Sequence, residues 1–165
     1  MLHLYLIRHA DAVPRTDPTY ADDDRPLTEL GKSQSRELGE ALTEHGVRFD
    51  VILCSRLPRA QQTVEALLAT LPEPKPPVVY TDELLPGFKP RKLDRELSRQ
   101  AGEAIALVGH EPDLSRYTAR LIGSKKACMD LAKAGVACVA CSEAPGKGCG
   151  SLVWLAPPAL FGAGD

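Results

Sequence analysis

The chain has 165 residues, the length of one ordinary domain with a single hydrophobic core. Its 44% hydrophobic and 25% charged residues are typical of a globular protein and exclude a disordered chain, and its net charge of −2 excludes the basic field of a general nucleic-acid binder. No apolar run approaches the roughly 20 residues that span a bilayer, and no charged leader precedes the first strand, so we expect a cytoplasmic protein that binds neither membrane nor nucleic acid.

The first half of the chain alternates predicted strands and helices. Residues 2–7 are apolar on both faces of a period-two pattern and predict a buried strand that ends at Arg8-His9. Thr28 is expected to cap a helix over residues 29–45, which Gly46 ends. A strand over 49–54 and an amphipathic helix over 58–71 are expected next.

The second half continues this alternation and then changes character. Its predicted elements are a short strand, a charged helix, a buried strand, a helix and a final hairpin, over residues 78–80, 92–100, 104–108, 114–122 and 136–155. This order predicts one three-layer α/β/α domain over residues 1–157, with a mostly parallel sheet and an antiparallel edge hairpin, followed by a C-terminal tail over 158–165.

Anion-binding and nucleophilic side chains follow three of the predicted strands. In open α/β sheets ligands bind outside the carboxyl ends of the strands, and this rule brings together Arg8, His9, Arg59 and His110. Arginine donates bidentately to phosphate, and a neutral imidazole nitrogen is a nucleophile. Phosphoryl transfer needs mainly positioning and charge stabilisation, which these groups supply, so we expect a phosphatase without a metal or other cofactor.

Four segments carry a more specific signal, because each follows a predicted strand or opens a helix. They are Leu6-Ile7-Arg8-His9-Ala10-Asp11-Ala12, Arg25-Pro26-Leu27-Thr28 with Gly31, Ser55 through Arg59-Ala60-Gln61-Gln62-Thr63, and Val108-Gly109-His110-Glu111-Pro112. In this order they resemble the histidine phosphatase superfamily, and the short chain is most similar to its SixA-type phosphohistidine phosphatases. The likeness covers residues 4–122, and it implies a phosphoglycerate mutase-like fold.

The resemblance also implies a role for each matching residue. His9 would accept the phosphoryl group, Arg8 and Arg59 would bind its equatorial oxygens, and His110 would donate a further hydrogen bond, after which water hydrolyses phospho-His9. The implied partner is a phosphohistidine-bearing signalling or phosphotransfer protein, met by a monomeric enzyme. Two alternatives stay open: a phosphatase of small phosphomonoesters or sugar phosphates with the same nucleophile, and a non-catalytic phosphate-recognition module, which would have no need of a nucleophile.

Two questions stay open about individual site residues. Arg56 stands where proline is common in the family and adds a second cation near the site; we favour Arg59 as the phosphate ligand because it carries the motif and lies in a first helical turn. The general acid is unassigned, with Glu83 the nearest candidate by position and Asp11 and Glu111 behind it. An uncertain acid favours P–N over P–O chemistry, because the imidazole leaving group of phosphohistidine is itself readily protonated.

Several other reactive side chains are interpreted as structural. His3 and His45 are assigned to packing or capping, the run from Asp22 to Asp24 to a solvated acidic loop, and Cys54 to the core. The odd number of cysteines favours free thiols in a reducing compartment. Cys138 and Cys141 have zinc-like spacing but would point to opposite faces of one strand, and Cys141 and Cys149 are expected roughly opposite each other in the hairpin; Cys128 has no assigned role.

Overall fold

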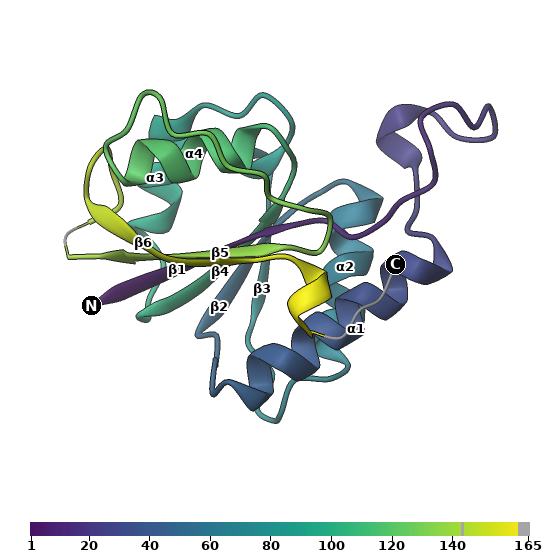
Figure 1. The fold of residues 1–165 in the computed structure, drawn as a ribbon, viewed down its shortest axis with the longest axis horizontal. Helices are drawn as coiled ribbons and strands as arrows, with labels where there is room; N and C mark the ends of the chain where they lie inside the picture. The colour runs from purple at the N-terminus through teal and green to yellow at the C-terminus, as the bar shows by residue number, and fades with distance from the viewer. Residues whose placement is uncertain (143, 162–165) are drawn as a thin grey trace.

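A computed structural model describes residues 1–142 and 144–161 and contains every strand and helix expected from the sequence (Figure 1). The strands are β1 (Leu2–Arg8), β2 (Val51–Ser55), β3 (Val78–Thr81), β4 (Ala104–Gly109), β5 (Val136–Cys141) and β6 (Gly150–Ala156). The helices are α1 (Glu29–Glu44), α2 (Pro58–Leu68), α3 (Pro90–Leu97) and α4 (Asp113–Leu121), with short 3-10 turns at Asp22–Asp24, Asp82–Leu84 and Pro158–Phe161.

All six strands belong to one sheet, in the order β3-β2-β4-β1-β5-β6. β1, β2, β3 and β4 run parallel, whereas the β5–β6 hairpin is antiparallel to β1 and forms one edge. Arg8 pairs with Gly109, and Cys54 pairs with Val108, so the carboxyl ends of β1, β2 and β4 meet at the same edge of the sheet. The predicted α/β/α architecture, mostly parallel sheet and antiparallel hairpin are confirmed.

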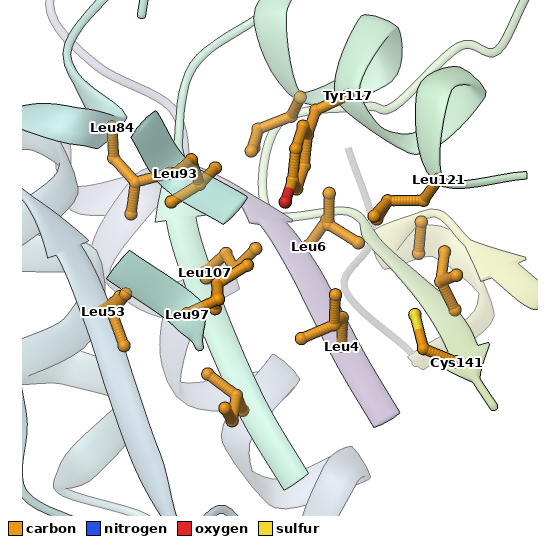
Figure 2. Packing of buried hydrophobic residues seen from close by; sticks show 14 of the residues in the cluster. Leu4, Leu6, Leu53, Leu84, Leu93, Leu97, Leu107, Tyr117, Leu121 and Cys141 are labelled. Atoms are coloured by element: carbon orange, nitrogen blue, oxygen red, sulfur yellow. The ribbon is translucent and has the colours of Figure 1, made fainter. Parts of the chain in front are cut away.

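Helices cover both faces of the sheet: α3 and α4 lie on one side, and α1 and α2 on the other (Figure 1). Leu4 and Leu6 of β1 join the core beneath α3 and α4, where they meet Leu107 and Tyr117 (Figure 2). Ile7 of the same strand joins the second core, beneath α1 and α2. This division explains why the strand is apolar on both faces, since each face is covered by a helical layer.

Three predicted elements have boundaries that are wrong by a few residues. α3 begins at Pro90 rather than 92, because proline is well suited to a first helical position. It ends at Leu97 rather than 100. α2 ends at Leu68 rather than 71, where the ammonium group of Lys75 donates to the carbonyls of Leu68 and Leu71 and takes the place of further helical hydrogen bonds. β2 starts at Val51 rather than 49.

Histidine and glycine end α1 as the sequence predicts. The His45 ring Nδ1 donates to the carbonyl of Ala41 at 2.8 Å, and Gly46 follows with φ +73°, a left-handed conformation that glycine adopts without strain. His45 is therefore a capping residue.

The cysteines of the hairpin face both cores. Cys141 lies in the core beneath α3 and α4, whereas Cys138 hydrogen bonds with Tyr5 on the other face of the sheet, so one strand cannot direct both thiols at one ion. Cys141 and Cys149 lie close together, with 3.2 Å between their sulfur atoms, and both are free thiols. Cys54 is fully buried in β2, as expected, and burial raises the pKa of its thiol to about 12.

Two findings concern the ends and exterior of the chain. Within the described residues, no helix is long and apolar enough to cross a membrane. Of the predicted tail, Pro158–Phe161 forms a short 3-10 helix against α1, and residues 162–165 lie outside the described residues.

Candidate active site

His9 lies immediately beyond the carboxyl end of β1, held by its backbone and its ring. Its backbone N–H donates to the carbonyl of Gly109 at 3.0 Å, which joins it to the end of β4. Its ring Nδ1 lies 2.8 Å from the carbonyl of Ala10. A carbonyl oxygen only accepts hydrogen bonds, so Nδ1 carries the proton and Nε2 carries the free lone pair.

The surroundings of His9 keep its imidazole neutral. The residue is 8% exposed, and burial together with the charges of Arg59, Arg8 and Arg25 lowers its pKa to about 4, against the opposing effect of the Ala10 carbonyl. At neutral pH the Nε2 atom is therefore unprotonated, as a nucleophile must be.

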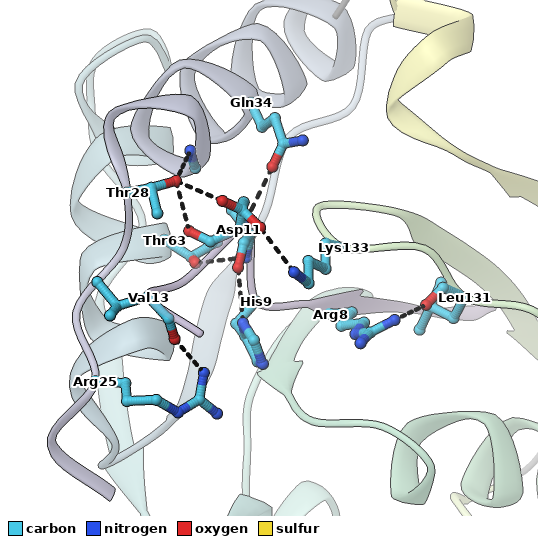
Figure 3. A network of polar contacts seen from close by, with 12 residues as sticks. Arg8, His9, Asp11, Val13, Arg25, Thr28, Gln34, Thr63, Leu131 and Lys133 are labelled. Carbon is cyan, nitrogen blue, oxygen red and sulfur yellow. Dashed lines mark hydrogen bonds and ion pairs between the residues drawn. The ribbon is translucent and has the colours of Figure 1, made fainter. Parts of the chain in front are cut away.

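Arg8 and Arg59 approach this histidine from two different elements. Arg8, the last residue of β1, donates from Nη1 to the carbonyl of Leu131 at 3.0 Å (Figure 3). Arg59, in the first turn of α2, is 2% exposed and donates from Nη1 to the carbonyl of Asp22 at 2.8 Å. The buried Nε atoms of both arginines have no hydrogen-bond partner among the described protein atoms, so each guanidinium keeps N–H donors for an anion.

Arg25 is a third cation of the site, to which the sequence analysis gave no role. It is 7% exposed, and it donates from Nε to Asp22 Oδ1 at 2.9 Å and from Nη1 to the carbonyl of Val13 at 2.7 Å. Figure 3 shows the His9 ring between Arg25 and Arg8. The signal was present, because Arg25 opens one of the matching segments and stands three residues after Asp22, a spacing that suits an ion pair.

Asp22 organises this arginine cluster, which refines the interpretation of the acidic run. Its carboxylate accepts from Arg25 and also pairs with Arg15 at 3.0 Å, while its carbonyl accepts from Arg59. Its neighbours Asp23 and Asp24 are exposed, as expected of a solvated loop.

His110 faces His9 across the site, with 5.3 Å between the ring centroids. Its Nε2 lies 2.8 Å from the hydroxyl of Ser55, which is itself fully buried at the end of β2. Ser55 Oγ also accepts from the backbone N–H of Leu57, and when its hydroxyl donates to Nε2 the imidazole proton of His110 sits on Nδ1. Burial, with the nearby charges of His9 and Arg59, lowers the pKa of His110 to about 3.

His110 Nδ1 is buried and has no partner in the described part of the chain, which leaves this ring nitrogen for a bound anion. Sequence reasoning found His110 but did not identify Ser55 as the group that orients its ring. Serine at a strand end is too common a feature to single out without the fold.

Arg56 and Arg59 have contrasting environments, which bears on the choice between them. The Arg56 side chain is 58% exposed, forms an ion pair with Asp82 at 2.9 Å and donates to the carbonyl of Tyr80 at 3.3 Å. Arg59 is instead buried among the site residues. The geometry therefore brings Arg59, and not Arg56, together with His9.

The three candidate acids differ in how they are held. Burial raises the pKa of Asp11, but the hydrogen bonds from Lys133 and Thr28 outweigh it and leave the pKa below its ordinary value. Glu83 lies 3.6 Å from the ammonium of Lys92.

Glu111, which follows His110, is the candidate whose pKa is raised. Burial causes this shift, against the opposing effect of the hydrogen bond from the Ser115 N–H to the carboxylate at 3.1 Å and of the Arg8 charge. Its environment therefore favours the protonated carboxyl, whereas that of Asp11 favours the carboxylate.

Comparison with known proteins agrees with this geometry. The family model "Histidine phosphatase superfamily (branch 1)" matches residues 4–85. An uncharacterized protein of Picosynechococcus is 36% identical over 144 residues, which is 82% of each chain. The adenosylcobalamin/alpha-ribazole phosphatase of Escherichia coli is 33% identical over 103 residues, which is 62% of this chain and only half of that enzyme.

Among solved structures, the protein histidine phosphatase SixA complexed with tungstate has a similar fold. The TM-score is 0.79 at 24% identity, over 97% of this chain and 99% of that one. The segment that the family model matches, residues 4–85, contains Arg8 and His9 at the end of β1 and Arg59 in α2. The chain therefore belongs to the histidine phosphatase superfamily, and with it to the phosphatases.

Proposed function

We propose that this protein hydrolyses phosphohistidine on another protein through a covalent phospho-His9 intermediate, without a metal ion. The observation that carries the proposal is the neutral Nε2 atom of His9, oriented by the Ala10 carbonyl and surrounded by the charges of Arg8, Arg25 and Arg59.

In the first step, His9 Nε2 attacks phosphorus, the P–N bond to the substrate imidazole breaks, and the departing imidazole leaves with a proton. Water then attacks phospho-His9, which restores the free imidazole and releases inorganic phosphate. Arg8 and Arg59 hold the equatorial oxygens through their remaining N–H donors, and His110 donates from Nδ1. Arg25 adds positive charge and holds the Asp22 carboxylate by a hydrogen bond, and Arg59 donates to the carbonyl of the same residue.

Metal independence follows from the same charges. Guanidinium groups supply the electrostatic stabilisation that a divalent cation provides in other phosphoryl-transfer sites, and their combined positive charge opposes the binding of such a cation.

The environments of Asp11 and Glu83 support P–N rather than P–O chemistry. The Asp11 carboxylate is stabilised in its charged form by Lys133 and Thr28, and Glu83 lies beside the ammonium of Lys92. An alkoxide leaving group needs a strong proton donor, whereas the imidazole of phosphohistidine departs without one.

The second candidate is a phosphatase of small phosphomonoesters or sugar phosphates with the same nucleophile. Two observations favour it. The chain is 33% identical in sequence, over 103 residues, to an adenosylcobalamin/alpha-ribazole phosphatase, and the raised pKa of Glu111 suits a general acid. A non-catalytic phosphate-recognition module accounts less well for His9, since anion binding gains nothing from an imidazole kept neutral by burial and by three nearby arginines.

The test is a comparison of substrates with wild type and His9→Ala. Both are incubated in EDTA with a histidine-phosphorylated protein, phosphoramidate and a panel of phosphomonoesters, and the reaction is quenched in base to trap the acid-labile phosphoenzyme. We expect a phosphoenzyme in wild type only, and faster turnover of the phosphohistidine substrate. Activity surviving in His9→Ala would refute the nucleophile, loss in EDTA would refute metal independence, and preference for one ester would establish the second candidate.

A further inference from the structure

The exposed side of α3 and α4 carries two neighbouring grooves with volumes of about 480 and 460 Å³. Every ionisable residue lining the first groove is basic. The second groove is lined by basic residues together with one acid, Glu111, and Arg120 lines both, so the two grooves adjoin and present one surface. We call it the cationic groove and define it by its basic residues: Lys89, Arg91, Lys92, Arg95, Arg116, Arg120 and Lys125.

The three acidic residues of α3 and α4 are mostly buried and offset only part of the charge of this groove: Asp94 pairs with Arg120, Asp113 lies at the limit of an ion pair with Arg116, and Glu96 lies beside Arg99 outside the groove. The side chain of Asp94 is 14% exposed and accepts hydrogen bonds from Tyr117 and Arg120. The side chain of Asp113 is 16% exposed and accepts from the backbone N–H of Gly87. The surface that remains is basic.

The other basic residues of the groove are exposed, and Arg120 is the exception, because its side chain is 24% exposed and donates to Asp94. The side chain of Arg116 is 75% exposed, and its distance to Asp113 is 3.9 Å, the limit of an ion pair. Lys89, Arg91 and Arg95 have no acidic partner within residues 1–142 and 144–161. For a chain with a net charge of −2, this is a strong local excess of positive charge.

The cationic groove reaches the rim of the active site at two points. Lys92, at one end, lies 3.6 Å from Glu83, which follows β3 at the carboxyl edge of the sheet. Glu111, in the second groove, is the residue after His110, and the charge of Arg8 acts on it. A polypeptide whose phosphorylated side chain reaches His9 therefore passes beside this surface.

We propose that the cationic groove binds an acidic stretch of the phosphorylated protein next to its phosphohistidine, and so selects among protein substrates. This inference rests on the proposed function and names the recognition chemistry of the same site. Opposite charges steer a substrate toward the site and favour it over neutral competitors, and both effects weaken as salt increases.

A polypeptide fits this surface better than a membrane or a nucleic acid does. Membrane binding calls for exposed apolar side chains and single-stranded nucleic acid for exposed aromatic ones. The large exposed hydrophobic side chains of the described chain all lie outside the cationic groove: Met1, Tyr20, Leu30, Tyr80, Leu152, Val153 and Leu160.

The test uses two peptides that carry one histidine phosphorylated with phosphoramidate, the first with glutamates around it and the second with glutamines in their place. The groove variant is the double charge reversal Arg91→Glu with Arg95→Glu, on the exposed side of α3. The matched control is Arg36→Glu with Arg48→Glu, which makes the same change in net charge at two exposed positions in and after α1.

We expect wild type and the control to prefer the glutamate peptide by roughly tenfold in kcat/KM, through KM, and to lose this preference in high salt. The groove variant should lose the preference while its activity on phosphoramidate stays within about twofold. An unchanged preference in the groove variant overturns the groove assignment alone. No hydrolysis of either peptide by wild type overturns the proposed function and the groove's role with it.

One further result would reassign the surface. If the groove variant loses binding to phosphatidylserine vesicles or to single-stranded DNA while its KM for the glutamate peptide is unchanged, the surface serves that other partner and the proposal is wrong.

Discussion

Replacing Arg59 with methionine tests the phosphate site most directly, because Arg56 provides a control of the same residue type three positions away. Arg59 uses one N–H on the Asp22 carbonyl, and its Nε is a buried donor without a protein partner in the described chain. In a buried site, removal of one group that stabilises the transition-state charge costs about 2.7–4 kcal/mol, which is a loss of about 10²–10³-fold in rate. Methionine keeps most of the side-chain volume, so packing in the first turn of α2 changes little.

Arg56→Met should behave differently. Its guanidinium is exposed and makes a surface ion pair with Asp82, an interaction worth about 0–1 kcal/mol. We expect kcat/KM for phosphoramidate to stay within about threefold of wild type.

The assay is steady-state hydrolysis of phosphoramidate by both variants, with thermal unfolding as the check that each is folded. Phosphate should raise the Tm of wild type and of Arg56→Met, but not that of Arg59→Met, since a ligand stabilises only the protein that binds it. Equal losses of activity in the two variants, or a larger loss in Arg56→Met, would refute the assignment of the phosphate ligand.

Three further predictions concern protonation, the second histidine and the core. A ¹⁵N NMR titration should give His9 a midpoint near pH 4. Because the unfolded chain binds this proton near pH 6.5, the free energy of unfolding should fall as pH drops from about 6.5 to 4. A midpoint near 6.5 in the folded protein would contradict the proposed environment. Ser55→Ala should cost about 1 kcal/mol of stability and about tenfold in kcat by releasing His110 Nε2, as measured by urea denaturation and turnover, and an unchanged kcat would show that the tautomer does not matter. Leu53→Ala, in the fully buried core, should destabilise by about 2–5 kcal/mol, whereas Leu152→Ala on the exposed edge strand β6 should cost less than about 1 kcal/mol; similar values in urea denaturation would be inconsistent with the two burials.

The sequence determines the layer order and the position of the nucleophile. Alternating apolar strands and amphipathic helices permit few arrangements other than a mostly parallel sheet covered on both faces, and the carboxyl-end rule then brings Arg8, His9 and His110 to one edge. Periodicity is a local property, so it is readable without the fold. Helix ends are less readable: the Lys75 side chain donates to carbonyls at the end of α2, and Pro90 suits the first position of α3.

The tertiary structure alone decided which polar side chains serve the site. Whether Arg56 or Arg59 faces His9 depends on burial, and the contacts of Arg25 with Val13 and of Ser55 with His110 join chain segments that meet only in the folded protein. Charge and desolvation act through space rather than along the chain, so the neutral imidazole of His9 and the inward-facing acids beneath the cationic groove follow from packing. The motif identified the nucleophile, and the fold determined its protonation and its neighbours.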